Sequence, residues 1–358
     1  MKKIVVAIVF VVCGLSLFAQ TSTVGSSYVS TAVPFLTISP DSRAAGMGDV
    51  GVATSPDANS QHWNVSKYVF IDKKMGFSFS YTPWLKEIAD RVSLGYVSGF
   101  YKFDKLQTVS ASIRYFSLGE VKLVDINNQN AQLFTPNEFA IDIGYSRLLA
   151  DELSVGVAFR YIRSNLFDGA DGNSFSADIS CYYTKALERD NIAFGIVVSN
   201  IGSKMRYING GDAYFLPANL RFGSTYTFNL NKDSKLSASI DINKLLVDGG
   251  ERVDNVSNGV VVVGGVRSEN SVFKSMFSSI SNFANITYSF GAEYLYREQF
   301  AVRTGYFFEQ EDVGNRKYFT AGVGVNYHDI NVDLAYLIPT TDNNPLKNTM
   351  RFSVGYSF

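Results

Sequence analysis

The sequence predicts an all-β protein: a 14-stranded antiparallel transmembrane β-barrel with an N-terminal hatch, or plug, segment in its bore. Three observations lead to this fold class. Apolar and polar residues alternate with a period of two from residue 75 onward, the ionised residues of these stretches fall on one side, and long and short connections follow one another in turn.

The alternation is clearest in three stretches, MGFSFSYT from Met75, FAIDIGYS from Phe139 and LSVGVAFRY from Leu153. Every second residue in them is large and apolar, and in a β-strand such residues point to one face. About fourteen segments of this kind begin near residues 75, 91, 106, 138, 152, 173, 191, 218, 235, 284, 298, 317, 330 and 349.

The ionised residues of the segments oppose the large apolar ones. A Lys or Arg on the lipid face costs roughly 2–4 kcal/mol at the bilayer midplane, whereas a lumen tolerates charge. A soluble sandwich also alternates, but its fourteen strands would have to divide between two packed sheets. We therefore predict a lumen network formed by Arg91, Arg114, Asp142, Arg160, Asp178, Arg221, Asp241, Glu293, Arg303, Asp333 and Arg351.

This predicted network contains five acids and six arginines, so its charges nearly cancel and suit mutual pairing that holds a plug. A path for a solute along the same residues is the alternative. A fourteen-stranded barrel is wider than side chains alone can fill, which calls for a plug.

Connection lengths support a membrane barrel, because outer-membrane barrels join strands by short periplasmic turns and long outer loops. Tight joins such as KFDK, LLADE and YHD alternate with long ones such as GEVKLVDINNQNAQLFTPNE. We assign the barrel to residues 75–358, with a long extracellular loop near 248–283. The chain ends in Phe358, an aromatic residue on the outward face, as bacterial outer-membrane barrels do.

The first residues, MKKIVVAIVFVVCGLSLFAQ, predict a secretory signal peptide over residues 1–19, with cleavage after Ala19. A retained membrane anchor is the alternative, but the apolar run is short for a spanning helix. Cleavage leaves Cys181 as the only cysteine, so no internal disulfide is expected.

Residues 20–74 lack the strict alternation but are too apolar for a free tail, and we assign them to the hatch. Their AGMGDVG contains Gly46, Gly48 and Gly51 in the spacing of a dinucleotide fingerprint. With Pro40 before it and Pro56 after it, the motif has no strand–helix frame. We expect these glycines to let the backbone approach the inner wall, near Gly76, Gly95, Gly144, Gly156, Gly223, Gly322 and Gly324.

Composition argues against several function classes. Lys and Arg number 32 against 33 Asp and Glu, which does not favour a nucleic-acid partner. The only histidines are His62, in the predicted hatch, and His328, in a predicted periplasmic turn, so neither would stand beside outer-leaflet lipid to activate a serine. We expect no enzyme activity, no metal site and no cofactor.

The longest connection offers a candidate partner-binding surface. It contains the apolar VVVVGG and a helical-looking SVFKSMFSS, and an exposed apolar patch is a docking surface for protein or lipid. Folding of this loop over the barrel mouth is the alternative. The candidate residues are Val260, Val261, Val262, Val263, Val272, Phe273, Met276 and Phe277.

The segment DSRAAGMGDVGVATSPDANSQHWN, residues 41–64, resembles the hatch of FadL-type outer-membrane barrels, and more specifically that of the PorV (LptO) family of the type IX secretion system. The resemblance extends through VVSNIG at 197–202 and YSFGAEYLY at 288–296. NVS at 64–66 departs from the Asn-Pro-Ala of the wider family and affects the expected turn geometry. The resemblance and the glycine motif together indicate eight hatch residues: Arg43, Gly46, Gly48, Gly51, Asp57, Asn59, Trp63 and Asn64.

The resemblance implies an outer-membrane cargo shuttle with loops at the cell surface. Such a protein binds the C-terminal signal domain of secreted cargo at the translocon barrel (SprA-like). It then carries the cargo to the sortase (PorU-like) attachment complex, which joins it to lipopolysaccharide. A FadL-like channel for hydrophobic solutes and an outer-membrane lipid A deacylase are the alternatives.

Overall fold

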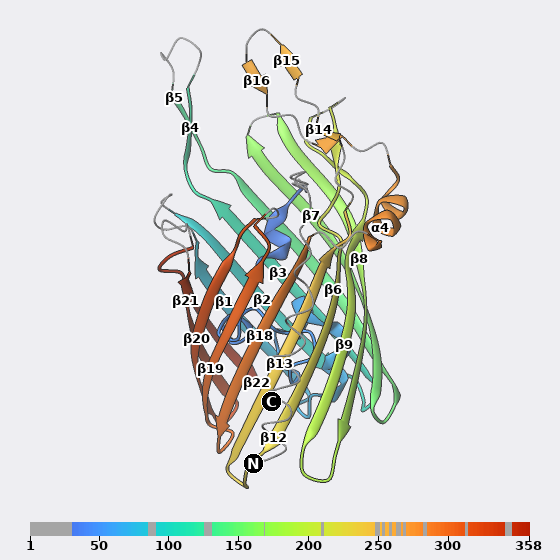
Figure 1. Ribbon diagram of the computed structural model, residues 1–358, viewed down its shortest axis with the longest axis vertical. Helices are drawn as coiled ribbons and strands as arrows, with labels where there is room; N and C mark the ends of the chain where they lie inside the picture. Colours follow the sequence, from blue (N-terminus) through green and yellow to red (C-terminus); the bar gives the residue numbers. More distant parts are fainter. Residues whose placement is uncertain are drawn as a thin grey trace.

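The computed structural model describes residues 31–84, 91–124, 131–167, 169–208, 211–247, 251–252, 255–257, 260–262, 266–267, 270–281, 285–311, 314–340 and 346–358. The predicted signal peptide lies outside them. Figure 1 shows a barrel of tilted antiparallel strands. The barrel strands are β1 (Met75–Pro83), β2 (Val92–Lys102), β3 (Gln107–Leu118), β6 (Asn137–Ala150), β7 (Leu153–Phe167), β8 (Ala170–Ala186), β9 (Asn191–Gly202), β12 (Asn219–Asn229), β13 (Ser234–Leu245), β18 (Ile286–Tyr296), β19 (Phe300–Glu309), β20 (Lys317–Tyr327), β21 (Ile330–Pro339) and β22 (Met350–Ser357).

Each barrel strand pairs with the next along the chain, and β1 pairs with β22 to close the ring, with Gly76 opposite Ser357 and Tyr81 opposite Phe352. Closure leaves no sheet edge with unpaired backbone groups, as a membrane requires. The predicted fold class, a closed 14-stranded antiparallel barrel, is confirmed. The strands begin within about three residues of the predicted starts, because the period of the pleat fixes where alternation begins and ends.

The two faces of the wall differ as the alternation predicts. Phe77, Ile143 and Phe159 are exposed on the outer surface, whereas Ser78 and Asp142 are buried. One of the glycines expected inside, Gly95, is wrongly placed by the prediction. It neighbours the inward-facing residues Leu94 and Tyr96 on β2 and therefore points outward.

The barrel has a short-turn end and a long-loop end. Connections such as residues 151–152 and 328–329 make the former, where the chain also ends (Figure 1). In the described part of the long-loop end there are four two-stranded sheets: β4 (Val121–Val124) with β5 (Ala131–Phe134), β10 (Met205–Arg206) with β11 (Ala213–Tyr214), β14 (Glu251–Arg252) with β17 (Val266–Arg267), and β15 (Asn255–Ser257) with β16 (Val260–Val262).

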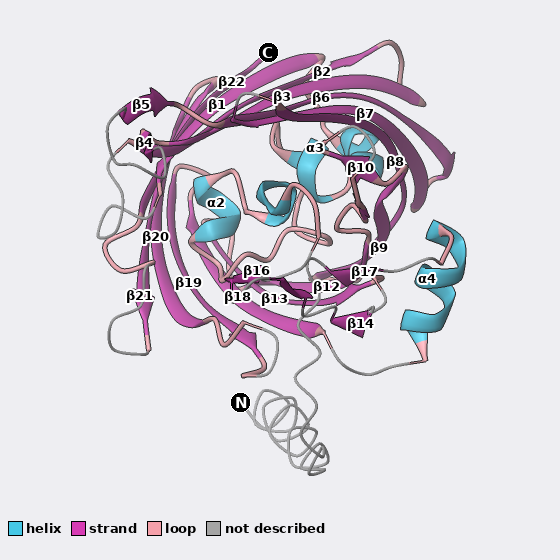
Figure 2. Cartoon of the chain, turned by 90° about the horizontal axis from the view of Figure 1, so that it is seen from above, coloured by secondary structure: helices cyan, strands magenta, loops and turns pink. Residues whose placement is uncertain are grey.

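The hatch lies inside the ring of strands, as Figure 2 shows from above. Its short helices are η2 (Pro34–Thr37), α2 (Ser42–Ala45), α3 (Ser60–Trp63) and η3 (Val65–Phe70). The one helix outside the wall is α4 (Val272–Ile280) among the residues described (Figure 2). None of the described helices is both long and apolar enough to span a bilayer.

The hatch is part of the buried core. At the long-loop half, Phe35 and Leu36 pack with Leu94 and Phe116 of the wall. Deeper in the bore, Tyr68 packs against Phe100 with ring centroids 5.3 Å apart. The hatch therefore shares the hydrophobic interior with the barrel, which resists its removal.

Candidate functional site

The glycine motif of the hatch sits against the wall. A Cβ atom on Gly48 would lie 2.7 Å from the backbone nitrogen of Tyr306 and 2.8 Å from the carbonyl oxygen of Phe290, and its φ is +70°. A Cβ on Gly51 would overlap the Trp63 ring at 2.1 Å. Only glycine fits such positions. The motif follows α2 rather than a strand, so it lacks the geometry that holds a dinucleotide.

Two glycines of β19 and β20 complement the motif. A Cβ on Gly305 would lie 2.1 Å from the carbonyl carbon of Met47, and one on Gly322 would lie 3.0 Å from Cα of Gly46. Gly322 is among the wall glycines expected to leave room for the hatch. Gly305 is not, because alternation shows which face a glycine is on but not what approaches it.

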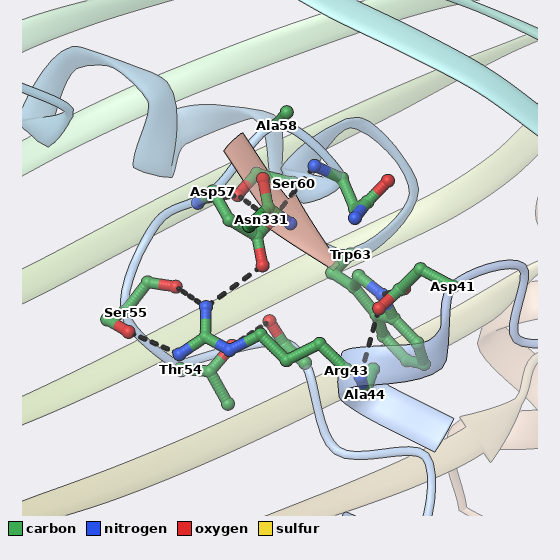
Figure 3. A network of polar contacts seen from close by, with 12 residues as sticks. Asp41, Arg43, Ala44, Thr54, Ser55, Asp57, Ala58, Ser60, Trp63 and Asn331 are labelled. Carbon is green, nitrogen blue, oxygen red and sulfur yellow. Dashed lines mark hydrogen bonds and ion pairs between the residues drawn. The ribbon is translucent and has the colours of Figure 1, made fainter. Parts of the chain in front are cut away.

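A hydrogen bond between Asp41 and Trp63 joins the two ends of the hatch segment 41–64 (Figure 3). Trp63 donates its Nε1 hydrogen to Oδ2 of Asp41 at 2.7 Å, and the Ala44 amide donates to Oδ1 at 2.9 Å, which caps α2. Burial raises the pKa of Asp41 to about 6. Sequence reasoning missed Asp41, although an Asp directly before a short helix is an N-cap signal.

Arg43 links the hatch to itself and to the wall. It binds both carboxylate oxygens of Glu293 on β18, with Nη2 3.0 Å from Oε1 and Nε 3.1 Å from Oε2. Its Nη1 donates to Asp57 at 2.9 Å and to the Ser55 carbonyl at 3.0 Å (Figure 3). Removal of one partner from a buried bidentate pair of this kind strongly destabilises the folded protein, because the other charge is left buried and unpaired.

The backbone after the motif is held by Asp241 of β13. The amides of Gly51 and Val52 both donate to its Oδ2, at 2.8 Å and 3.0 Å. The amide nitrogen of the Asn64 side chain donates to the Val52 carbonyl, and Lys67 Nζ donates to the Gly51 carbonyl at 2.7 Å. Burial lowers the pKa of Lys67 to about 8. Lys67 carried no sequence signal, because its region lacks periodicity.

The predicted lumen residues divide into separate groups. Arg160 bridges Asp142 at 2.6 Å and Asp178 at 2.9 Å on adjacent strands. Arg303 bridges Glu293 at 2.7 Å and Asp333 at 2.6 Å. These two clusters pair wall with wall, and only the second extends into the hatch through Arg43.

Other lumen arginines contact the hatch directly. Arg351 pairs with Asp49 at 2.9 Å. Arg114 donates to the Leu36 carbonyl at 3.0 Å and to Nδ1 of His62 at 2.6 Å. The polar groups of the bore thus hold the plug at several heights.

Arg91 is wrongly predicted to face the lumen. It precedes β2, has a φ of 65°, and its side chain is 73% exposed beside Glu120. The prediction placed the large apolar residues of β2 on the outer face, but Leu94 and Tyr96 point inward and Leu94 packs with the hatch, so residue 91 has the parity of the outer face.

The two histidines lie far apart in the fold. His62 is buried in the hatch, where burial and the neighbouring Arg114 lower its pKa. His328 lies in the turn between β20 and β21 at the short-turn end. Among the residues that the structure describes, no three His, Cys, Asp or Glu side chains are grouped to hold a metal ion.

The described partner-binding candidates lie on two elements, helix α4 and strand β16. Phe273 and Phe277 of α4 are exposed, at 64% and 72%, whereas Val272 and Met276 are partly buried. Residues 260–262 form β16, and Val263 lies outside the described residues. The four helix residues therefore do not share one exposed face.

A closed fourteen-stranded barrel with a hatch in its bore defines the class of this protein as a plugged antiparallel β-barrel, a fold with solved examples. The toluene transporter TodX of Pseudomonas putida has the same fold, with 12% identity and a TM-score of 0.56 over 88% of this chain and 96% of that one. The CymD monoaromatic hydrocarbon channel is similar, with 12% identity and a TM-score of 0.57 over 89% and 97%. At these identities the likeness concerns the fold alone.

Within that class, a family model described as "Type IX secretion system protein PorV" matches residues 21–252. The chain belongs to the PorV family. It is an outer-membrane component of the type IX secretion system. No curated protein matches the sequence.

Proposed function

We propose that the protein is a carrier that binds the C-terminal signal domain of secreted cargo at the translocon and delivers it to the cell-surface sortase complex. The family match over residues 21–252, which include the hatch and most of the barrel, carries this proposal. The hatch supports it. Because the plug is fixed by buried contacts such as Arg43 with Glu293, the long-loop end is the better place for a protein partner.

The long-loop end faces the cell surface in this proposal, and the short-turn end faces the periplasm. Its partners are the translocon barrel, the cargo signal domains and the sortase attachment complex, within a membrane containing lipopolysaccharide. Loops on a rigid barrel present binding residues with little ordering cost. Exposed aromatic residues of α4, Phe273 and Phe277, are the candidate anchors.

A channel for hydrophobic solutes is the second candidate, because TodX and CymD are named as a transporter and a channel. It requires the hatch to leave a path through the bore. The carrier requires no such path, so the two functions differ in how they depend on hatch movement.

Affinity purification from gently solubilised outer membrane tests the carrier. The protein should bring the translocon barrel and several cargo proteins with it, and a chain lacking residues 256–280 should bring far less cargo while its barrel stays folded. Normal cargo recovery with the deletion would refute the role of this loop. Recovery of no secretion partner by the full chain, together with failed uptake of an apolar nutrient in its absence, would favour the channel.

A further inference from the structure

A cavity of about 210 Å³ lies in the bore at the long-loop half. The hatch contributes Ser39 and Trp63 to its lining, and the long-loop ends of β12 and β13 contribute Asn219, Arg221 and Asn243. Pockets for drug-sized ligands are usually about 300–1,000 Å³. This cavity therefore suits a small molecule or one end of a larger one.

Arg221 differs from the other buried arginines of the wall. Arg160 and Arg303 bind carboxylates, Arg351 binds Asp49, and Arg114 binds hatch carbonyls. Arg221 is only 4% exposed, and its Nε and Nη1 atoms have no hydrogen-bond partner. Its guanidinium stacks over Trp63 with 5.5 Å between Cζ and the ring centroid. Guanidinium nitrogens that are buried without a hydrogen-bond acceptor are costly, so an acceptor beside Arg221 would be favourable.

The acids that line the cavity are already engaged. Asp49 accepts from Arg351 at 2.9 Å and from the Tyr318 hydroxyl at 2.6 Å. Glu309 accepts from Arg316 at 2.7 Å. Asp241, on the strand beside Arg221, gives its Oδ2 to two hatch amides, has no hydrogen-bond partner on Oδ1, and does not line the cavity. Among the lining residues, Arg221, Arg316 and Arg351 thus outnumber Asp49 and Glu309 by one charge.

We propose that this cavity is an anion site that takes one carboxylate group, held by Arg221. A guanidinium binds a carboxylate with short, charge-assisted hydrogen bonds, and the lining also contains the polar residues Asn219 and Asn243. The ligand carries a single negative charge and a small body. It can be a free organic acid or the carboxyl terminus of a chain entering from the long-loop end.

Tryptophan fluorescence gives a direct measurement, because the chain has 2 tryptophans and both Trp63 and Trp84 line the cavity. The full chain in detergent is titrated with propionate and with its neutral analogue propionamide. Propionate should change the emission in a saturable way, and propionamide should not. Arg221→Gln should weaken propionate binding about tenfold or more, Arg221→Lys should retain part of it, and Arg163→Gln, a change at an exposed arginine, should have no effect.

A second variant keeps the test decisive if Arg221→Gln does not fold. Asn219→Asp places a carboxylate two residues away on the same face of β12, where it can pair with Arg221 and exclude the ligand. It should abolish binding while the barrel still migrates as a folded species in unheated gels.

Two short peptides, one with a free carboxyl terminus and one with a terminal amide, identify the source of the ligand. Tighter binding of the free-acid peptide than of propionate indicates a chain terminus, and the reverse indicates a free acid; both support the site. Emission unchanged by propionate and by the free-acid peptide, or equal binding by Arg221→Gln and wild type, would overturn the proposal.

Discussion

At the scale of single residues, close approach of two backbones decides which positions must be glycine. Gly48 combines a positive φ with wall atoms closer than 3 Å to a Cβ position. Gly169, at the turn between β7 and β8, has a φ of +83° but nothing within 4 Å of that position. Both glycines therefore have a left-handed backbone, but only Gly48 is also in close contact with the barrel wall.

These two glycines give a matched prediction. Gly169→Ala should cost about 1–2 kcal/mol from the left-handed backbone alone, whereas Gly48→Ala should cost clearly more, because the hatch must also move. The midpoint temperature at which the folded band disappears in heated gel samples measures both. Equal midpoints for the two variants would show that the hatch does not press on the wall at residue 48.

Burial of Lys67 predicts a dependence of stability on pH. Its pKa is about 8 in the folded protein and near 10.4 in an unfolded chain, so between these values the unfolded state binds more protons. Stability should therefore rise as pH increases from about 8 to 10. Lys67→Met should flatten that rise when thermal midpoints are compared across the range, and an unchanged slope would show that Lys67 is hydrated.

At the scale of elements, the hatch and α4 have different relations to the barrel. The hatch helices are short and are held by side chains of the wall, since none is long enough to be stable alone. Helix α4 lies outside the ring and carries an exposed pair, Phe273 and Phe277, one helical turn apart. Its other exposed residues include Lys274.

The exposed pair on α4 should matter for partner capture and little for folding. Phe273→Ser combined with Phe277→Ser should reduce co-purified cargo severalfold, because aromatic anchors supply much of the energy of an interface. Lys274→Ser, on the polar side of the same helix, serves as the control. Equal cargo recovery from both variants, quantified by mass spectrometry, would assign α4 another role.

The network around Arg43 connects the hatch to β18. Arg43→Gln leaves Glu293 with only Arg303 as a charged partner, so the thermal midpoint should fall, by an amount corresponding to about 3 kcal/mol or more. Arg163→Gln, at an exposed pair, should change it little. A midpoint insensitive to Arg43→Gln would show that the apolar contacts alone retain the hatch.

At the scale of the whole molecule, the barrel was predictable from the sequence and the hatch contacts were not. A one-residue slip of a strand would turn residues such as Phe159 and Arg160 to the wrong faces, so alternation fixes the wall strongly. The hydrogen bond between Asp41 and Trp63 joins two residues of the hatch, where the sequence has no regular alternation, so no sequence pattern predicts it. Arg91 and Gly95 were misplaced because large apolar residues of β2 face the hatch rather than lipid, which alternation alone cannot distinguish.

The function, too, was predicted from the sequence only in part. The motif from Asp41 to Asn64 led to the family, and the family model agrees. The loop residues 260–263, the sides of the membrane that the two ends face and the transfer to the sortase remain predictions. They depend on partners, which no feature of a single chain specifies.

In the proposed function, the protein binds cargo at its long-loop end while the hatch stays in place. Ser42 of the hatch and Ser353 of β22 have their hydroxyl oxygens 3.0 Å apart, so cysteines at these positions would bring two sulfur atoms close together. The most direct measurement is cargo recovery from Ser42→Cys with Ser353→Cys, in a Cys181→Ser background, before and after reduction. Undiminished recovery with the hatch locked is the predicted result. Loss of cargo in the oxidised protein, restored by reductant, would contradict it.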